Sequence, residues 1–154
     1  MRSLLRFLAT FGPVGSAPVA PATAGSAVVA LIGWFLPAPP LALALVLIAV
    51  GTALAVWIAG EAEKDLGHDA RPIVVDEAVG QSLALLFVPH TVPAFAAAFV
   101  LFRIFDVWKP LGAREIQRLP GGLGVVADDV IAGLTACGAF HAGAWAGRAM
   151  GWLS

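Results

Sequence analysis

An all-α fold, a small multi-helix bundle within a membrane, is predicted for this chain by three features of its sequence. Hydrophobic residues make up 60% of the 154 residues and the mean hydropathy is +0.90, above the usual values of soluble globular domains. Uncharged stretches of helix length alternate with short polar segments, and prolines and glycines divide them. The length predicts a single domain, residues 1–154.

The first apolar region contains no charged residue from Phe7 to Gly60, and its prolines divide it into two predicted helices. Residues 23–36 are short for a membrane span. Residues 41–60 provide about 20 helical residues, enough at 1.5 Å each to cross a hydrocarbon core roughly 30 Å thick. The proline-rich link between the two predicts an antiparallel pair.

The next apolar run, 78–102, is interrupted by prolines near its middle and is consistent with two arrangements. Predicted helices at 77–88 and 92–108 form either one kinked span or a hairpin that returns to the same side of the membrane. The hairpin is favoured because it lets the acidic residues before and after this run share one membrane face.

The last predicted helix, 129–152, carries Gly143, Gly147 and Gly151 at four-residue spacing. A stripe of small residues allows helices to approach closely, so we expect it to pack against another helix. A homodimer through the same face is the alternative.

Charge distribution excludes some partners and predicts an orientation. The net charge is −1 and the pI about 6.2, so no basic excess indicates a nucleic-acid partner. Cys137 is the only cysteine, which excludes an intrachain disulfide and a cysteine-based zinc site.

By the positive-inside rule, the polar segments are expected to face the cytoplasm in a multi-pass membrane protein. The basic residues on that face are Arg2, Arg6, Lys64, Arg71, Arg103, Lys109, Arg114 and Arg118.

Two pairs of adjacent acids, Asp76–Glu77 and Asp128–Asp129, stand where helices are predicted to begin. An all-oxygen ligand set suits Mg²⁺ better than zinc or copper. Neighbours on a helix point about 100° apart, so one member of each pair is expected to bind metal while the other orients a cation or water. We expect Glu77 and Asp129 as the main ligands, followed by Asp76 and Asp128. Asp76, Asp128 and Asp129 are also the catalytic candidates.

Arg103, Asp106 and Lys109 recur every three residues, so on a helix they cover roughly a third of the circumference and can face one site. Arg103 and Lys109 are the candidates for binding a substrate phosphate. Asp106 either holds both cations in place or adds a metal ligand. The alternative is a salt-bridge ladder on a solvated face. The glycines from Gly121 to Gly124 either offer backbone N–H groups to the phosphate or form a plain turn.

The three histidines are expected to have ordinary roles. His90 and His141 lie in apolar stretches of the sequence, which predicts structural or hydrogen-bonding roles for both. His68 follows an acidic segment, where a solvated loop histidine is expected and a metal contact is the alternative.

Three blocks resemble the phosphatidylglycerophosphatase A family of bacterial membrane lipid phosphatases, in order and in spacing. They are residues 69–80 (DARPIVVDEAVG), 102–110 (FRIFDVWKP) and 121–133 (GGLGVVADDVIAG). A weaker block, 17–26, keeps part of the family's proline-glycine-threonine-x-glycine-serine stretch. Within these blocks the weaker candidates for the site are Thr23, Ser26, Asp69, Gly121 and Gly122.

The resemblance implies Mg²⁺-dependent hydrolysis of phosphatidylglycerophosphate to phosphatidylglycerol and inorganic phosphate, a step of phospholipid synthesis at the inner face of a bacterial cytoplasmic membrane. Its implied partners are that lipid and the bilayer. Two departures stand out: Ala22 replaces the family's usual glycine, and Leu111-Gly112-Ala113 replaces an apolar residue, proline and isoleucine. Whether an aspartate is phosphorylated or water attacks directly stays open.

Two other classes of membrane protein also use carboxylates on their helices. A small ion or proton transporter would place its carboxylate relays within the spans, whereas the paired acids here are predicted at helix ends. A CDP-alcohol phosphotransferase also uses carboxylates on membrane helices, but its long aspartate signature is absent from this sequence.

Overall fold

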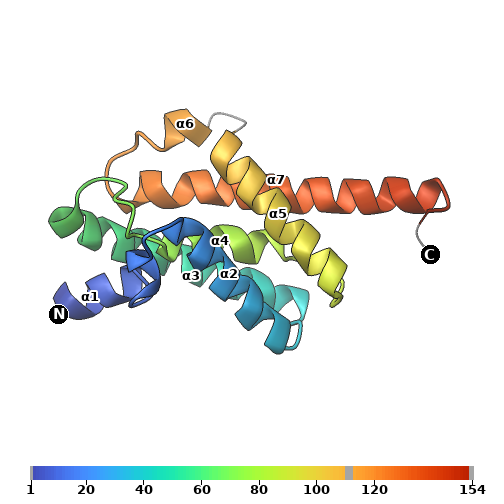
Figure 1. The fold of residues 1–154 in the computed structure, drawn as a ribbon, viewed down its shortest axis with the longest axis horizontal. Coiled ribbons are helices and arrows are strands. Elements are labelled where there is room, and N and C mark those ends of the chain that lie inside the picture. The colour runs from blue at the N-terminus through green and yellow to red at the C-terminus, as the bar shows by residue number, and fades with distance from the viewer. Residues whose placement is uncertain (1, 110–112, 153–154) are drawn as a thin grey trace.

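The computed structural model describes residues 2–109 and 113–152, which form helices and no strand. Residues 110–112, which include Pro110 and most of the departure after Lys109, lie outside the described residues. The helices are α1 (Arg2–Ala9), the 3₁₀ turn η1 (Val14–Ser16), α2 (Pro21–Phe35), α3 (Leu41–Leu66), α4 (Val75–Ala84), α5 (Val92–Trp108), α6 (Ala113–Ile116) and α7 (Gly122–Ala149). In Figure 1, α7 is the long horizontal helix, and its C-terminal end extends past the other helices. The predicted all-α class is confirmed, and α3 and α7 are long and apolar enough to cross a membrane.

Helices α2 and α3 follow from their proline and glycine boundaries. Pro21 begins α2, where a missing backbone N–H has no cost. Helix α3 continues past the predicted end at residue 60 as far as Leu66. The added segment, 61–66, consists mostly of good helix formers, and Gly67 ends the helix with φ of 96°. The last turns of α3 are therefore polar.

The run from 78 to 102 is a hairpin, and the alternative of a single kinked span is wrong. Helix α4 has only ten residues, so it covers about 15 Å, half of a hydrocarbon core. Near its start, Glu77 contacts Arg103, which lies near the end of α5, so the two helices are antiparallel. At the turn of the hairpin, the carbonyl oxygen of Leu86 lies 2.9 Å from Nε2 of His141 on α7. His141 therefore has the hydrogen-bonding role expected of it.

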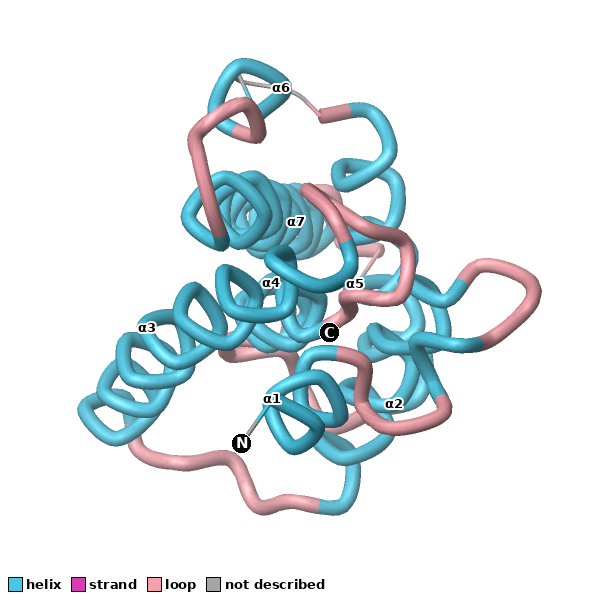
Figure 2. The backbone as a smooth tube through the Cα atoms, turned by 90° about the vertical axis from the view of Figure 1, so that its left-hand side faces the viewer, coloured by secondary structure: helices cyan, strands magenta, loops and turns pink. Residues whose placement is uncertain are grey.

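Helix α4 is the centre of the bundle. It packs against α2, α3, α5 and α7, and Figure 2 shows it near the middle of the molecule. Eight of its ten residues are buried, including both acids of its first turn. The ends at which α3 and α5 finish and α4 and α7 begin lie together, and we call this region the polar end of the bundle. Because α4 has no solvated face, its carboxylates at the polar end lie inside the protein.

Glycines set the close approach of α7 to its neighbours. A Cβ on Gly133 would lie 2.3 Å from the carbonyl oxygen of Gly80 on α4. A Cβ on Gly122 would lie 2.0 Å from the carbonyl oxygen of Val56 on α3. The predicted start of this helix at residue 129 is wrong, because α7 already begins at Gly122. The contact with α3 stabilises helical glycines that have low intrinsic helix propensity.

We expect Gly133→Ala to lower the free energy of unfolding by about 1–3 kcal/mol, because the new methyl group would meet backbone atoms of α4. The matched control is Gly138→Ala on the same helix, where a Cβ has open space. That change should be neutral or stabilise by up to about 1 kcal/mol through helix propensity. Thermal unfolding in detergent micelles measures both variants, and equal stabilities would contradict the close packing of α7 on α4.

The glycine stripe near the C-terminus does not pack as expected. A Cβ on Gly143 or on Gly151 would meet nothing within 4 Å, and Gly151 lies beyond the end of α7. Gly147 is buried. The expectation fails for the other two because this half of α7 runs past the rest of the bundle (Figure 1). No described contact supports a dimer through this face.

Candidate active site

Three carboxylates from three helices meet at the polar end: Glu77 of α4, Asp106 of α5 and Asp129 of α7. One oxygen of each lies within 4.8 Å of the others, and we call this group the three-carboxylate cluster. Glu77 is 4% exposed and Asp129 is 3% exposed. The two acidic pairs of the sequence therefore converge, each through one member, and Asp106 provides the third carboxylate.

Arg103 links two members of the cluster to each other. One terminal nitrogen, NH1, donates to Oε2 of Glu77 at 2.6 Å and to Oγ of Ser26 at 3.1 Å. The other, NH2, lies 2.9 Å from Oδ2 of Asp106. The planar guanidinium has donors on two separate nitrogens and so serves both carboxylates at once. The salt-bridge ladder considered from the sequence is thus present in part. It does not lie on a solvated face, since the Arg103 side chain is only 16% exposed.

Ser26 of α2 joins the site as a buried hydroxyl. Its Oγ lies 2.8 Å from Oε2 of Glu77 and 2.9 Å from the carbonyl oxygen of Ala22. A hydroxyl has one proton, so it can donate to only one of these acceptors at a time. Thr23, on the same helix, makes no described contact with the cluster. The weak sequence block therefore contributes Ser26, and the Ala22 departure lies directly beside it.

The second members of the acidic pairs, Asp76 and Asp128, make other described interactions. Asp128 forms an ion pair with Lys109, which ends α5 in a left-handed conformation with φ of 52°. Oδ1 of Asp76 accepts a hydrogen bond of 3.0 Å from the backbone amide of Glu77. Both acids are buried. Because α7 begins at Gly122, Asp128 and Asp129 lie about two turns into the helix rather than at its start.

The site holds more negative than positive groups. Burial raises the pKa of Glu77 to about 7, although the Arg103 guanidinium opposes the shift. Burial and the neighbouring Glu77 carboxylate raise the pKa of Asp76 well above its usual range. Oδ2 of Asp129 is buried and has no hydrogen-bond partner in the part of the chain that the structure describes. The cluster thus offers hard oxygen donors, one of them unused, and this donor set fits a cation such as Mg²⁺.

The glycines before α7 do not surround the cluster. Gly122 contacts α3, and a Cβ on Gly124 would lie 2.3 Å from the carbonyl oxygen of Leu119 in the segment before the helix. Gly121 takes a positive φ of 66° at the helix N-cap. Of the two interpretations, the described contacts favour a turn and a packing contact over a phosphate-binding loop.

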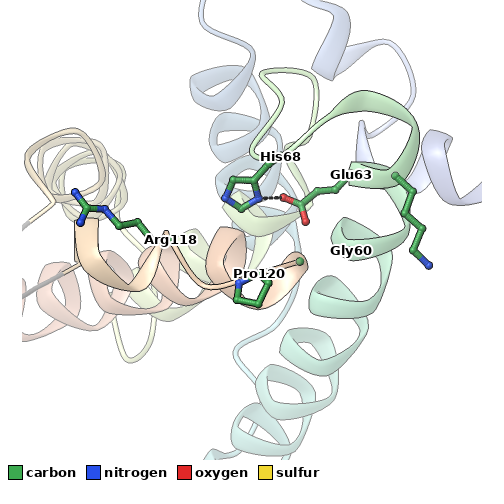
Figure 3. A pocket seen from close by; sticks show the side chains of 7 residues that line it. Gly60, Glu63, His68, Arg118 and Pro120 are labelled. Carbon is green, nitrogen blue, oxygen red and sulfur yellow. Dashed lines mark hydrogen bonds and ion pairs between the residues drawn. The ribbon is translucent and has the colours of Figure 1, made fainter.

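A separate groove of about 500 Å³ lies at the polar end, outside the three-carboxylate cluster. Figure 3 shows the Glu63–His68 pair on one side of it and Arg118 pointing away from that pair. The lining residues are Gly60, Glu63, Lys64, His68, Arg118, Pro120 and Gly121. Nδ1 of His68 lies 2.5 Å from Oε1 of Glu63, and this hydrogen bond raises the pKa of His68.

The loop after α3, which contains His68 and Asp69, is hydrogen-bonded to Gln117 in the segment before α7. The Asp69 carboxylate accepts a hydrogen bond from the Gln117 side chain, and Nε2 of His68 lies 3.3 Å from the Gln117 carbonyl oxygen. Asp69 therefore connects two loops and makes no described hydrogen bond to the cluster. His90 has a structural role, since Nε2 lies 2.7 Å from the Trp34 carbonyl oxygen and its ring stacks on Phe95.

The helical bundle holds buried carboxylates beside an arginine fork, and these are groups that phosphate-ester chemistry uses. The chain belongs to the phosphatidylglycerophosphatase A family, whose sequence model matches residues 7–144. It is therefore a lipid phosphatase. Family membership also decides against a transporter. The position of the acids alone would not do so, because Asp129 lies inside α7 and not at a helix end.

The chain is 35% identical over 131 residues to a phosphatidylglycerophosphatase A of Escherichia coli, covering 82% of this chain and 76% of that protein. It is 40% identical over 128 residues to a protein of Bacteroides thetaiotaomicron named "Putative phosphatidylinositol-3-phosphatase", covering 78% and 80% of the two chains. A phosphatidylglycerophosphatase A of Haemophilus influenzae is 37% identical over 86 residues, covering 54% and 53%. No solved structure matches the chain.

Proposed function

We propose that this protein hydrolyses phosphatidylglycerophosphate to phosphatidylglycerol and inorganic phosphate in a Mg²⁺-dependent reaction of bacterial phospholipid synthesis. The observation that carries the proposal is the three-carboxylate cluster, in which an unpartnered oxygen of Asp129 lies with Glu77 and Asp106 beside Arg103. Family membership supports the choice of a lipid phosphomonoester as substrate.

Glu77, Asp106 and Asp129 would hold the magnesium ion, which when bound supplies positive charge against the phosphoryl oxygens. Arg103 fixes the orientation of Glu77 and Asp106, so their oxygens are positioned before substrate arrives. Ser26 limits the rotation of Glu77 through a second hydrogen bond.

Lys109 is placed to meet the substrate phosphate. It lies at the polar end of α5, one turn beyond Asp106, and its side chain is 21% exposed. Its ammonium is paired with Asp128, so a phosphate dianion would compete with that carboxylate for the same cation. Phosphate binding would therefore leave Asp128 free to accept a proton or to orient water.

The orientation of the bundle supports a cytoplasmic site. The polar end carries Lys64, Arg103 and Lys109 as well as the cluster, and by the positive-inside rule these cations favour a cytoplasmic position for this end. Helices α3 and α7 would cross the bacterial cytoplasmic membrane, while the α4–α5 hairpin enters and returns. The protein would thus be a multi-pass membrane enzyme whose lipid substrate reaches the site from the inner leaflet.

The test is phosphate release from defined lipids in mixed micelles. Phosphatidylglycerophosphate should be hydrolysed with Mg²⁺, EDTA should lower the rate at least about 100-fold, and added Mg²⁺ should restore it. Phosphatidylinositol 3-phosphate, assayed in parallel, tests the substrate suggested by the Bacteroides relative. Full activity in EDTA would refute the metal requirement, and a clear preference for the inositol lipid would refute the substrate assignment.

A further inference from the structure

Gln81 of α4 is a buried amide with no hydrogen-bond partner among the described residues. Its side chain is 0% exposed, and neither Nε2 nor Oε1 has a hydrogen-bond partner. Among the described residues, the third buried side-chain atom without a partner is Oδ2 of Asp129, which belongs to the three-carboxylate cluster. Buried amides are nearly always satisfied, because an unpaired donor or acceptor is costly. A group from outside the chain is therefore expected to meet Gln81.

The position of Gln81 places it at the floor of the candidate site. It follows Glu77 by four residues and so lies on the same face of α4, about 6 Å further from the polar end. Long side chains on a helix lean toward its N-terminus, which here is the direction of Glu77. The preceding residue, Gly80, packs against the Asp129 backbone and the Phe102 ring. Gln81 is thus about one turn deeper in the bundle than Glu77, on the same face of α4.

The chemistry of an amide narrows the choice of partner. A metal ion would use only its oxygen, and a phosphate only its N–H groups, whereas a hydroxyl can accept from Nε2 and donate to Oε1. We propose that Gln81 binds a free hydroxyl of the polyol headgroup and makes the enzyme selective for lipid phosphates that carry one beside the phosphoester. This inference rests on the proposed function and extends it to the substrate class.

The experiment compares phosphatidylglycerophosphate with an analogue that has hydrogen in place of the headgroup's central hydroxyl. The wild-type enzyme should prefer the hydroxylated lipid in kcat/KM by about 10–100-fold, the cost of leaving a buried polar group unpaired. In Gln81→Leu, kcat/KM for phosphatidylglycerophosphate should fall while kcat/KM for the analogue stays the same. The variant should therefore lose the preference. Thermal stability should not fall, because the variant removes an unpaired amide.

Ser82→Ala, on the same helix and only partly buried, is the matched control and should keep the wild-type preference. Gln81→Met, with a flexible side chain of similar length, replaces the leucine variant if that variant does not fold. An unchanged preference in the Gln81 variants, or no preference in the wild-type enzyme, would overturn the inference and indicate that Gln81 binds only a water molecule. If the wild-type enzyme hydrolyses neither lipid, the proposed function itself fails, and the inference fails with it.

Discussion

Asp129→Asn should lower the rate of phosphate release by about 10³-fold and leave the protein folded. Asparagine has the shape of aspartate but lacks the charge that a bound cation requires. Asp129 is 3% exposed and lies within 4.8 Å of two other carboxylates, so removing its charge relieves repulsion rather than breaking a bond. Phosphate release at saturating Mg²⁺ and a thermal unfolding curve measure the two effects.

Glu61→Gln is the control for this change, because Glu61 is an acid at the end of α3 whose recorded partner is the exposed Lys64. It should keep wild-type activity. A rate for Asp129→Asn within tenfold of the wild-type rate would exclude Asp129 from the chemistry. A folded variant that regains activity at high Mg²⁺ would instead assign Asp129 to metal affinity.

Arg103→Ala should be the most destabilising single change at the site, by about 3–5 kcal/mol. The Arg103 side chain is 16% exposed and joins Glu77, Asp106 and Ser26. Its loss leaves two carboxylates without their cation in a buried site. Urea unfolding in micelles with EDTA measures the change without a bound metal that could compensate.

Lys64→Ala provides the contrast, since its ion pair with Glu61 is exposed and should contribute no more than about 1 kcal/mol. Adding Glu77→Gln to Arg103→Ala should recover part of the lost stability, because one unpaired charge is removed. A cost for Arg103→Ala similar to that of Lys64→Ala would show that the buried network contributes little to folding.

The positions of the main carboxylates could be predicted from local patterns. The paired acids and the three-residue spacing of Arg103, Asp106 and Lys109 predicted which helix faces carry charge, and the contacts of Arg103 and Lys109 agree with that prediction. The hairpin followed from the requirement that the acids share a membrane face. The roles of these residues in metal binding and catalysis stay predictions until the variants are measured.

The errors came from glycines, whose local preferences are weak. The Gly121–Gly124 segment was expected to precede its helix, yet Gly122 begins α7 because it rests on Val56 of α3. Gly143 was expected to pack and does not, since no neighbouring helix reaches that part of α7. In both cases the outcome depends on which helix lies alongside, and a residue without a side chain carries no periodic signal of that neighbour.

The sequence alone determined that this protein is a helical membrane protein with acids and bases at one end, and its motif blocks identified the family. Hydropathy and helical periodicity are properties of neighbouring residues, so they can be recognised without a structure. Only the tertiary structure decided that Asp106 joins Glu77 and Asp129, that Asp128 pairs with Lys109, and that Gln81 is buried without a described partner. Those facts depend on distances between helices far apart in the chain, which are set by how closely their glycines allow them to pack.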